Sequence, residues 1–460
     1  MLPLDTEAVL HGWLVRERWI LVAAALGLVL FGFPGLMSYD SVAQLDQARR
    51  WDLGDWHPPA MALVWRAVEV VVAGPVGMLL LQISAFVGGG YLLLRSSMSA
   101  RAAAWTTLAL CWYPPILTTM GVIWKDSQMA GYLLLGLAAL RSSRPRVRWA
   151  GVAVLVIASA MRHNAAAATF APILLLWNAE APQPRWRRLA IACAVWIGIS
   201  ATSVGMNAVL AQREEHPWTR SVAVTDIVGI VRWSPPLDDA YLSRVLAGTR
   251  LRVTENIQRA LTDKYEVRGW LVYYQGAPPL ELPETESEHA ATAAAWQTLA
   301  LAQPGAYLRF RWEVYRRVIH LGGRAYVPPL QLTFSYAGDP ALAERIRHQA
   351  SPSGLQRLAF SIVKKVGGVL YVPYIYIVVS LVLLGFARRQ RVALALLLSG
   401  ICYEASLFVA APSPDYRYSH WLVTTTMLAV ALIVARRAQN VSVITPPSVR
   451  PPPSAAGASP

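Results

Sequence analysis

Long apolar runs separated by short arginine clusters constrain the fold of this 460-residue chain more than any other feature. A membrane-spanning helix needs about 20 apolar residues, or fewer where neighbouring helices bury part of it. Such runs occupy residues 19–36, 76–95, 102–119, 128–140, 149–161, 165–177, 189–211, 366–387, 392–411 and 421–435. The sequence therefore predicts an all-α polytopic membrane protein with about ten transmembrane helices.

The arginine clusters fall at every second boundary between these runs. They comprise Arg16/Arg18, Arg95/Arg101, Arg141/Arg144/Arg146/Arg148, Arg185/Arg187/Arg188, Arg388/Arg389/Arg391 and Arg436/Arg437. Positively charged loops stay in the cytoplasm, so we expect a multi-pass protein of the plasma (inner) membrane with both termini cytoplasmic. This distribution also accounts for the net charge of +15, and we expect no nucleic-acid partner.

Four regions follow from this pattern. Residues 1–211 form an N-terminal transmembrane module whose external loops we expect to be catalytic, and 212–365 form an external domain. Residues 366–437 hold the C-terminal transmembrane helices, and 438–460 form a Pro-rich cytoplasmic tail that we expect to be disordered. Within the external domain, 290–302 and 306–321 read as helices, the second being basic and amphipathic as in helices that lie on lipid.

The polar motifs all fall on the face opposite the arginine clusters. Asp40 stands a few residues beyond the first apolar run, where a partly desolvated carboxylate can act as a general base or an electrostatic partner. His57 precedes Pro58-Pro59, which holds its backbone extended. Asp46, Asp52 and Asp55 in the same loop are more simply explained as solvated charge.

Two further motifs interrupt apolar runs. Ionisable side chains at such a depth are costly unless they serve a site, which makes Lys125-Asp126 and Arg162-His163-Asn164 functional candidates. The simpler alternatives are an interfacial anchor at Trp124 and a plain reversal between two short helices at 162–164.

A last motif, Asp415-Tyr416-Arg417-Tyr418, precedes the final apolar run. The planar guanidinium of arginine suits a phosphate. Lys125, Arg162 and Arg417 are all expected beside Asp40, with too few carboxylates nearby to compensate each cation separately. We therefore expect them to share an anionic ligand, the phosphate of a lipid.

The motif series resembles that of bacterial GT-C fold membrane glycosyltransferases. It runs YDSVAQ and GDWHPP after the first span, then IWKDS, MRHNA and PDYRY, with echoes in TDIVGI at 225–230 and in W…PGAYLRFRW at 296–312. The resemblance implies a GT-C-like bundle with a mainly helical external domain. It also implies a hexosyl- or pentosyltransferase that moves a sugar from a polyprenyl-phosphate donor to an envelope glycan, lipid or protein outside the membrane.

Residue roles follow from the same resemblance. Asp40 would be the catalytic base, and Lys125, Arg162 and Arg417 would bind the carrier phosphate. The full set of expected substrate-binding residues is His57, Lys125, Asp126, Arg162, His163, Asn164, Asp415, Arg417 and Tyr418. No second acid adjoins Asp40, which is flanked by Tyr39 and Ser41, so we expect no catalytic metal and no cofactor.

Two other functions stay open on the sequence. An O-antigen-type polymerase or ligase also combines many spans with a long external loop, but it does not require a carboxylate in the first loop. A transporter or flippase of lipid-linked sugars usually shows repeat symmetry between its halves. No such symmetry is visible here, because the external segment divides the predicted spans unequally.

Overall fold

The computed structural model describes residues 17–177, 182–263, 278–322, 331, 340–341, 344 and 351–444, with side chains to 439. Arg16 and most of the predicted tail at 438–460 lie outside these residues, as does much of 323–350 within the predicted external domain. Every named element of the described residues is a helix, which agrees with the predicted all-α class.

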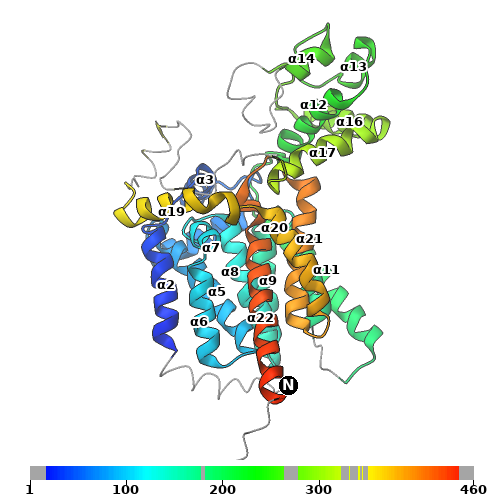
Figure 1. Ribbon diagram of the computed structural model, residues 1–460. Helices are drawn as coiled ribbons and strands as arrows, with labels where there is room; N and C mark the ends of the chain where they lie inside the picture. The colour runs from blue at the N-terminus through cyan, green and yellow to red at the C-terminus, as the bar shows by residue number, and fades with distance from the viewer. Residues whose placement is uncertain are drawn as a thin grey trace, which may run out of the picture.

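The helices of the N-terminal half follow one another with short connections. They are α2 (Arg18–Gly32), α3 (Tyr39–Arg50), α4 (Ala60–Glu69), α5 (Pro75–Arg95), α6 (Ala100–Cys111), α7 (Pro114–Met120), α8 (Lys125–Leu140), α9 (Pro145–Ala160), α10 (Ala166–Leu176) and α11 (Arg185–Leu210). Most of them run side by side along one direction, whereas the short helix α3 lies at one end of the bundle (Figure 1).

The C-terminal half begins with a separate group of helices. These are η1 (Trp218–Ala223), α12 (Val224–Trp233), α13 (Asp239–Val245), α14 (Ile257–Asp263), α16 (Glu286–Ala302) and α17 (Pro304–Val318). The chain then returns to the bundle through α19 (Gly354–Leu370), α20 (Pro373–Ala387), α21 (Arg391–Ala410), η2 (Tyr416–Ser419) and α22 (His420–Ile444).

The chain is a multi-pass membrane protein. Among the described residues, α5, α11, α21 and the segment Tyr416–Gln439 are long and apolar enough to cross a membrane, which makes four candidates. Counting the bent pair α19 and α20 as one span raises this number to five. Helices α2 and α10 are apolar but shorter, and the expected count of ten spans remains a prediction.

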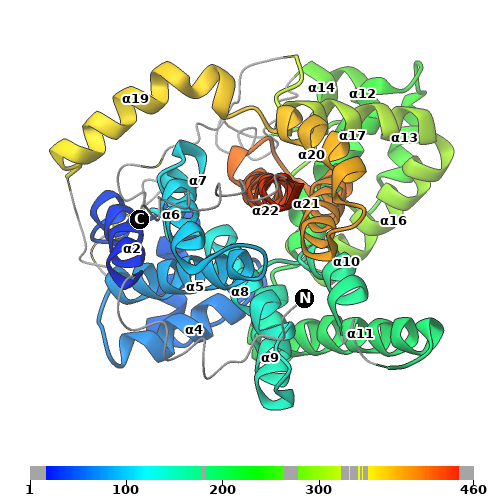
Figure 2. The same cartoon turned by 60° about the horizontal axis from the view of Figure 1, so that its bottom comes forward.

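Two predicted spans are interrupted by proline. The span expected at 366–387 is divided between α19 and α20, which bend by 53° at the break. Pro373 begins α20, and Val372 before it has an extended backbone with φ −122° and ψ 91°, as expected of a residue before proline. The span expected at 102–119 is likewise divided between α6 and α7, with Pro114 at the start of α7. In Figure 1, α19 lies across the end of α2, and Figure 2 shows it at the periphery of the bundle.

The arginine-rich loops meet at the end of the bundle away from the group α12 to α17 (Figure 1). Gln439 Nε2 donates to the carbonyl of Ser97, at a distance of 2.9 Å, and Arg436 donates to the carbonyl of Arg389. Three of the predicted clusters therefore share one end of the molecule. The cytoplasmic orientation of this end stays a prediction.

Close backbone packing joins α5 to α8 in the centre of the bundle. A Cβ added at Gly89 would lie 2.4 Å from the backbone nitrogen of Leu135 and 2.5 Å from the carbonyl carbon of Leu134. Real Cβ atoms do not approach a backbone so closely, so a larger residue at 89 would push the two helices apart.

The group α12 to α17 has its own hydrophobic core, formed by residues such as Ile227, Ile230, Leu242 and Leu299. Helix α17 corresponds to the helix predicted at 306–321, but the expected contact of its apolar face with lipid is wrong. Phe310, Val314 and Val318 are buried inside the protein, and so is Arg311. The amphipathic pattern of 306–321 correctly predicts a helix, but it does not distinguish an apolar face that packs against protein from one that lies on lipid.

Candidate active site

Two segments that are distant in sequence lie side by side where α3 and α8 begin. The backbone N–H of Ile123 donates to the carbonyl of Leu36 across 2.9 Å. One residue further on, Trp124 Nε1 donates to the Ser38 hydroxyl across 2.8 Å. These bonds hold the first residues of α3 against the first residues of α8, and they place the two predicted motifs next to each other.

The segment before α8 is also held from inside the bundle. Gln82, fully buried on α5, donates through Nε2 to the carbonyls of Met120 and Val122, at 2.7 and 3.0 Å. The Met120 carbonyl ends α7 and the Val122 carbonyl lies between α7 and α8, so neither has a partner within a helix. The bonds therefore fix the approach to α8 and the position of Lys125 at its first turn.

Arg417 lies between two carboxylates. Its Nη2 donates to Asp40 Oδ2 across 2.6 Å, and its Nε lies 2.8 Å from Asp415 Oδ2. The Arg417 Nη1 is buried and has no hydrogen-bond partner among the described residues. A donor of this kind inside a protein normally has an acceptor, so this nitrogen marks a place where a ligand oxygen would bind.

His57 connects Asp40 to Lys125. The Lys125 Nζ lies 3.0 Å from His57 Nδ1, and His57 Nε2 lies 3.7 Å from Asp40 Oδ1. Burial and the neighbouring Lys125 ammonium lower the pKa of His57 to about 3, so the imidazole is neutral at pH 7. Its Nδ1 then accepts from the ammonium, and its protonated Nε2 faces the carboxylate.

The carboxylate of Asp40 is ionised. Burial alone would raise its pKa, but the Arg417 guanidinium, with smaller contributions from His57 and Lys125, holds the pKa of Asp40 well below its usual range. In the unliganded protein Asp40 is thus a strong electrostatic partner of Arg417 and a weak base. A change in its surroundings is required before it can accept a proton.

Arg162 forms a second ion pair beside the first. It donates to Asp126 Oδ1, and its guanidinium lies over the Tyr418 ring, 4.6 Å from the ring centroid. Asp126 is 1% exposed. Tyr418 also lies beneath Arg417, with the guanidinium 5.6 Å from the ring centroid. The Tyr418 ring is therefore within cation–π distance of both guanidinium groups.

The remaining two predicted residues lie at the edge of this group. His163 is exposed, and a proton on its ring would lower the pKa of His57. Asn164 donates to the Ser406 hydroxyl on α21 across 2.9 Å, a contact between helices rather than a contact within the cluster. The ten residues expected at the site thus gather in one region, with Asn164 turned toward α21.

The expectation that the cations lack nearby carboxylates is wrong. Arg162 is paired with Asp126, and Arg417 with both Asp40 and Asp415. Asp415 was expected at the site as a substrate-binding residue, and the structure shows it to be a counter-ion. Among the described ion pairs Lys125 has no carboxylate partner, because its contact is with His57.

Three residues next to this cluster were not expected. The buried side chains of Tyr403, Glu404 and His420 all hold polar atoms without a partner among the described residues. Glu404 Oε1 accepts from the Ser419 hydroxyl across 2.8 Å, and its Oε2 has no partner. An acidic residue inside the apolar run at 392–411 is a recognisable signal of a functional position, so Glu404 could have been found from the sequence.

The described residues contain one group with the side chains of a metal site. Glu214, His216 and Glu286 each place one ligand atom within 4.8 Å of the others. Both glutamates are 79% exposed, and His216 Nε2 already bonds to Glu286 Oε1 across 2.7 Å. Exposed acids of this kind are common without an ion, and none of the three was expected at the active site.

The chain matches no model of a known protein family, and no curated protein matches it. It is similar to the crystal structure of an Archaeoglobus fulgidus oligosaccharyltransferase in complex with Zn and sulfate (13% identity, TM-score 0.34), covering 92% of this chain and half of that one. It is also similar to Cupriavidus metallidurans ArnT bound to undecaprenyl phosphate (16% identity, TM-score 0.32), covering 94% and 79% of the two chains. The apo state of that ArnT gives 15% identity and a TM-score of 0.30 over 95% and 80%. With TM-scores below 0.5, these similarities decide neither the fold nor the function.

Proposed function

We propose that this protein is a membrane glycosyltransferase that moves a sugar from a polyprenyl-phosphate donor to an acceptor of the cell envelope, outside the membrane. The observation that carries the proposal is the cluster of Lys125, Arg162 and Arg417 around Asp40, at the end of the bundle that bears the separate helical group. Arg417 is buried, whereas Lys125 and Arg162 are half-buried. Among the described residues Arg417 Nη1 has no hydrogen-bond partner and Lys125 has no carboxylate partner, so these two groups indicate an anionic substrate.

Lys125 and Arg417 are the groups best suited to the donor phosphate. The Arg417 Nη1 is an unused donor, and Lys125 has no carboxylate among its described contacts. A guanidinium binds two phosphate oxygens in one plane, whereas an ammonium acts as a point charge. Arg162 is paired with Asp126, so we assign it a structural role: it keeps Asp126 and the neighbouring side chains in position and adds positive potential to the site.

In the proposed reaction the acceptor hydroxyl oxygen attacks the anomeric carbon of the donor sugar. The bond between that carbon and the phosphate oxygen breaks, and its electron pair leaves with the polyprenyl phosphate. The hydroxyl proton passes to the Asp40 carboxylate. Lys125 and Arg417 stabilise the negative charge that develops on the leaving phosphate, which is where fixed positive groups lower the barrier most.

Arg417 would then have two successive partners. Without donor it is held by Asp40 and Asp415, and the donor phosphate competes for the same guanidinium. As Arg417 turns toward the phosphate, the charge that holds the Asp40 pKa low moves away, and Asp40 becomes a better base. Donor binding thereby prepares the carboxylate for the acceptor.

A binding experiment with purified protein in lipid nanodiscs tests the proposal. Undecaprenyl phosphate is titrated into wild type, Lys125→Ala and Arg417→Ala, with Arg213→Ala as the control because Arg213 is a half-exposed cation paired with Asp52 at the surface. Both site variants should bind the carrier at least about tenfold more weakly, given 1.5–3 kcal/mol for a charged hydrogen bond. Equal affinity in all four proteins would contradict the carrier site.

A second measurement separates transfer from the alternatives. The proposal requires that purified protein consume a lipid-linked sugar and form a new glycosidic bond, and that Asp40→Asn abolish this without preventing carrier binding. Full activity of Asp40→Asn would favour a polymerase or ligase. Movement of the donor between leaflets with no sugar consumed would favour a transporter.

A further inference from the structure

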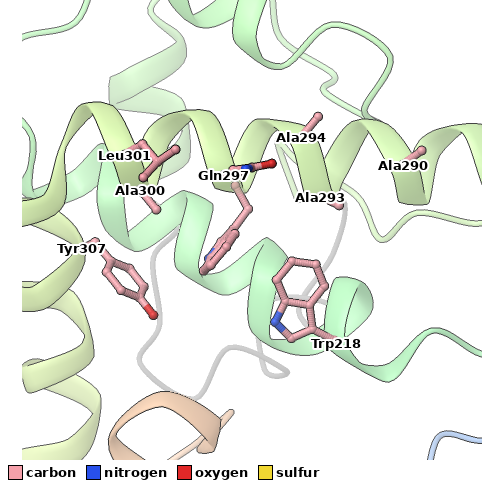
Figure 3. A pocket seen from close by; sticks show the side chains of 9 residues that line it. Trp218, Ala290, Ala293, Ala294, Gln297, Ala300, Leu301 and Tyr307 are labelled. Atoms are coloured by element: carbon pink, nitrogen blue, oxygen red, sulfur yellow. The ribbon is translucent and has the colours of Figure 1, made fainter.

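The separate helical group contains an aromatic pocket away from the active-site cluster. Its volume is about 710 Å³, within the range of small-molecule sites. Trp218 from η1 and Tyr307 from α17 lie below α16 in Figure 3, and the small side chains of Ala293 and Ala300 line the pocket on that side of α16. Trp296 lies between them, with ring centroids 5.1 Å from Trp218 and 5.9 Å from Tyr307, both edge to face.

We infer that this pocket binds an uncharged saccharide, and, since this rests on the proposed function, that the saccharide is part of the acceptor. One face of a sugar ring presents C–H bonds with slight positive charge, which pack against the negative face of an aromatic ring. Three aromatic side chains on one depression provide such faces at fixed angles.

The polar groups of the pocket decide between a sugar and a hydrocarbon chain. Gln297, the Tyr307 hydroxyl and the Trp218 N–H have no hydrogen-bond partner within the described part of the chain. An acyl chain would cover these groups and leave them unpaired, at a cost in free energy. Sugar hydroxyls can both donate and accept, and they satisfy an amide, a phenol and an indole together.

The lining also excludes a charged ligand. In a chain with a net charge of +15, no Asp, Glu, Lys, Arg or His is among the described residues that line the pocket. A phosphate or an acidic peptide would find no counter-charge there, in contrast to the cluster around Arg417. The two sites are therefore suited to different parts of the reaction, one to the anionic donor and the other to a neutral acceptor.

A chain of polar contacts connects the pocket to the active-site loop. Trp296 Nε1 donates to Asp226 Oδ2 across 2.9 Å, and Asp226 Oδ1 accepts from Arg311 Nη1 across 3.0 Å. Arg311 also donates to the carbonyls of Phe408 and Ala411, at 2.8 and 2.9 Å. Ala411 begins the loop that carries Asp415 and Arg417, so one buried ion pair holds both the pocket wall and the loop in place.

Saturation-transfer NMR on the full-length protein in lipid nanodiscs tests this inference, because detergents with sugar headgroups would compete. The probes are neutral oligosaccharides of two to four hexose or pentose units. Wild type should transfer saturation to ring C–H protons of at least one probe. Trp218→Ala and Gln297→Ala should each lower the affinity for that probe about tenfold or more. The matched control is Trp312→Ala, since Trp312 is a half-exposed tryptophan of α17 outside the pocket; it should bind as wild type does.

The outcome is separable from that of the proposed function. Trp218→Ala should raise the KM for acceptor while undecaprenyl phosphate binding stays unchanged, and Lys125→Ala should do the reverse. No binding of any probe by wild type, or equal binding by Trp218→Ala and Trp312→Ala, would overturn the saccharide pocket and leave the donor site intact. Quenching of pocket tryptophans by lipids brominated on the acyl chain, abolished only in Trp218→Ala, would overturn it in favour of a hydrocarbon ligand.

Discussion

The Arg417 guanidinium donates to the Asp40 carboxylate across 2.6 Å, although 377 positions separate the two residues in the sequence. One residue follows the first apolar helix and the other precedes the last. Their ion pair therefore closes the bundle at one end and joins the two motifs on which the proposed chemistry depends. A donor phosphate that binds the unused Arg417 Nη1 would therefore meet a guanidinium that a carboxylate already holds through Nη2.

Asp40→Asn is expected to separate binding from turnover. The amide keeps the shape of the side chain but removes the negative charge that holds Arg417, so undecaprenyl phosphate should bind at least as tightly as in wild type. Turnover should fall about 10²- to 10⁴-fold, the usual contribution of a positioned base. Calorimetric titration and a transfer assay measure the two effects. Weaker carrier binding by Asp40→Asn would show that Asp40 is not a competitor of the phosphate.

Arginine in place of Lys125 should be only partly tolerated. The Lys125 ammonium contacts His57 Nδ1 as a single point charge, whereas a guanidinium is longer, planar and already present next to it in Arg417. Lys125→Arg should therefore bind the carrier more tightly than Lys125→Ala but turn over more slowly than wild type. The carrier titration and the transfer assay, run on all three proteins, test this order. Wild-type turnover in Lys125→Arg would contradict the specific role of an ammonium.

His57 should make the protein sensitive to acid. Its folded pKa of about 3 lies below the ordinary value of 6.5, so the unfolded chain binds a proton first and stability falls as the pH drops below about 6.5. The loss is at most about 1.4 kcal/mol for each pH unit. Asp40 contributes only below about pH 3.8, its ordinary pKa, because there the unfolded chain begins to take up a proton while the folded pKa is held lower.

The comparison that tests this is His57→Gln against wild type, by thermal unfolding midpoints at pH 7 and pH 4.5. Glutamine offers an amide for the contact with Lys125 but does not titrate. The midpoint should fall less between the two pH values in the variant. The charged and titratable groups that face His57 are Asp40 from α3, Lys125 from α8, Arg417 from η2 and His163 from the α9–α10 loop. An equal fall in both proteins would assign the acid sensitivity to another group.

Orientation in the membrane can be measured with single cysteines in a background without Cys111, Cys193 and Cys402. Ser287 and Ser143 are both exposed in the structure. Ser287 lies in the separate helical group, and Ser143 lies in the arginine-rich α8–α9 loop. If arginine-rich loops are cytoplasmic, Ser287→Cys should react with an impermeant maleimide in intact spheroplasts, and Ser143→Cys only after permeabilisation. The opposite pattern would place the candidate active site in the cytoplasm.

Several parts of this structure follow from local pattern. Helices α5, α11 and α21 begin and end within a few residues of the expected runs at 76–95, 189–211 and 392–411, since an uninterrupted apolar sequence without an internal proline has no alternative in a membrane. Pro373 also predicts the break between α19 and α20 from sequence, because the residue before a proline avoids helical geometry.

Other parts depend on tertiary contacts that no local pattern contains. An amphipathic helix at 306–321 would keep its arginines on the polar face, yet Arg311 is 1% exposed because Asp226, 85 positions earlier, pairs with it inside the protein. Gly229 shows the same dependence: a Cβ there would lie 2.1 Å from the ring of Phe310. A residue on α12 thus decides how closely α17 can approach.

The Arg311–Asp226 pair offers the last prediction. Both side chains are almost completely buried, and burial raises the pKa of Asp226 despite the attraction of Arg311. Removing one partner of a buried pair leaves an uncompensated charge and costs about 3–5 kcal/mol, whereas replacing both with residues of similar volume can be nearly neutral. Arg311→Met should therefore destabilise the helices α12 to α17 more than the double variant Arg311→Met with Asp226→Leu.

The rate at which a protease cleaves the separate helical group under native conditions measures this difference without unfolding the membrane helices. Arg311→Met should be cleaved fastest, the double variant more slowly, and Arg309→Met, which removes a cation stacked over Trp233 at 4.0 Å outside the ion pair, should resemble wild type. The double variant cannot restore the two bonds from Arg311 to the carbonyls of Phe408 and Ala411. If the ion pair alone sets stability, the double variant will resist the protease as well as wild type does. If the two carbonyl bonds also hold the loop before Asp415, the double variant will still resist the protease but will bind undecaprenyl phosphate more weakly than wild type. Cleavage of the double variant as fast as that of Arg311→Met would contradict the assignment of the cost to an unpaired buried charge.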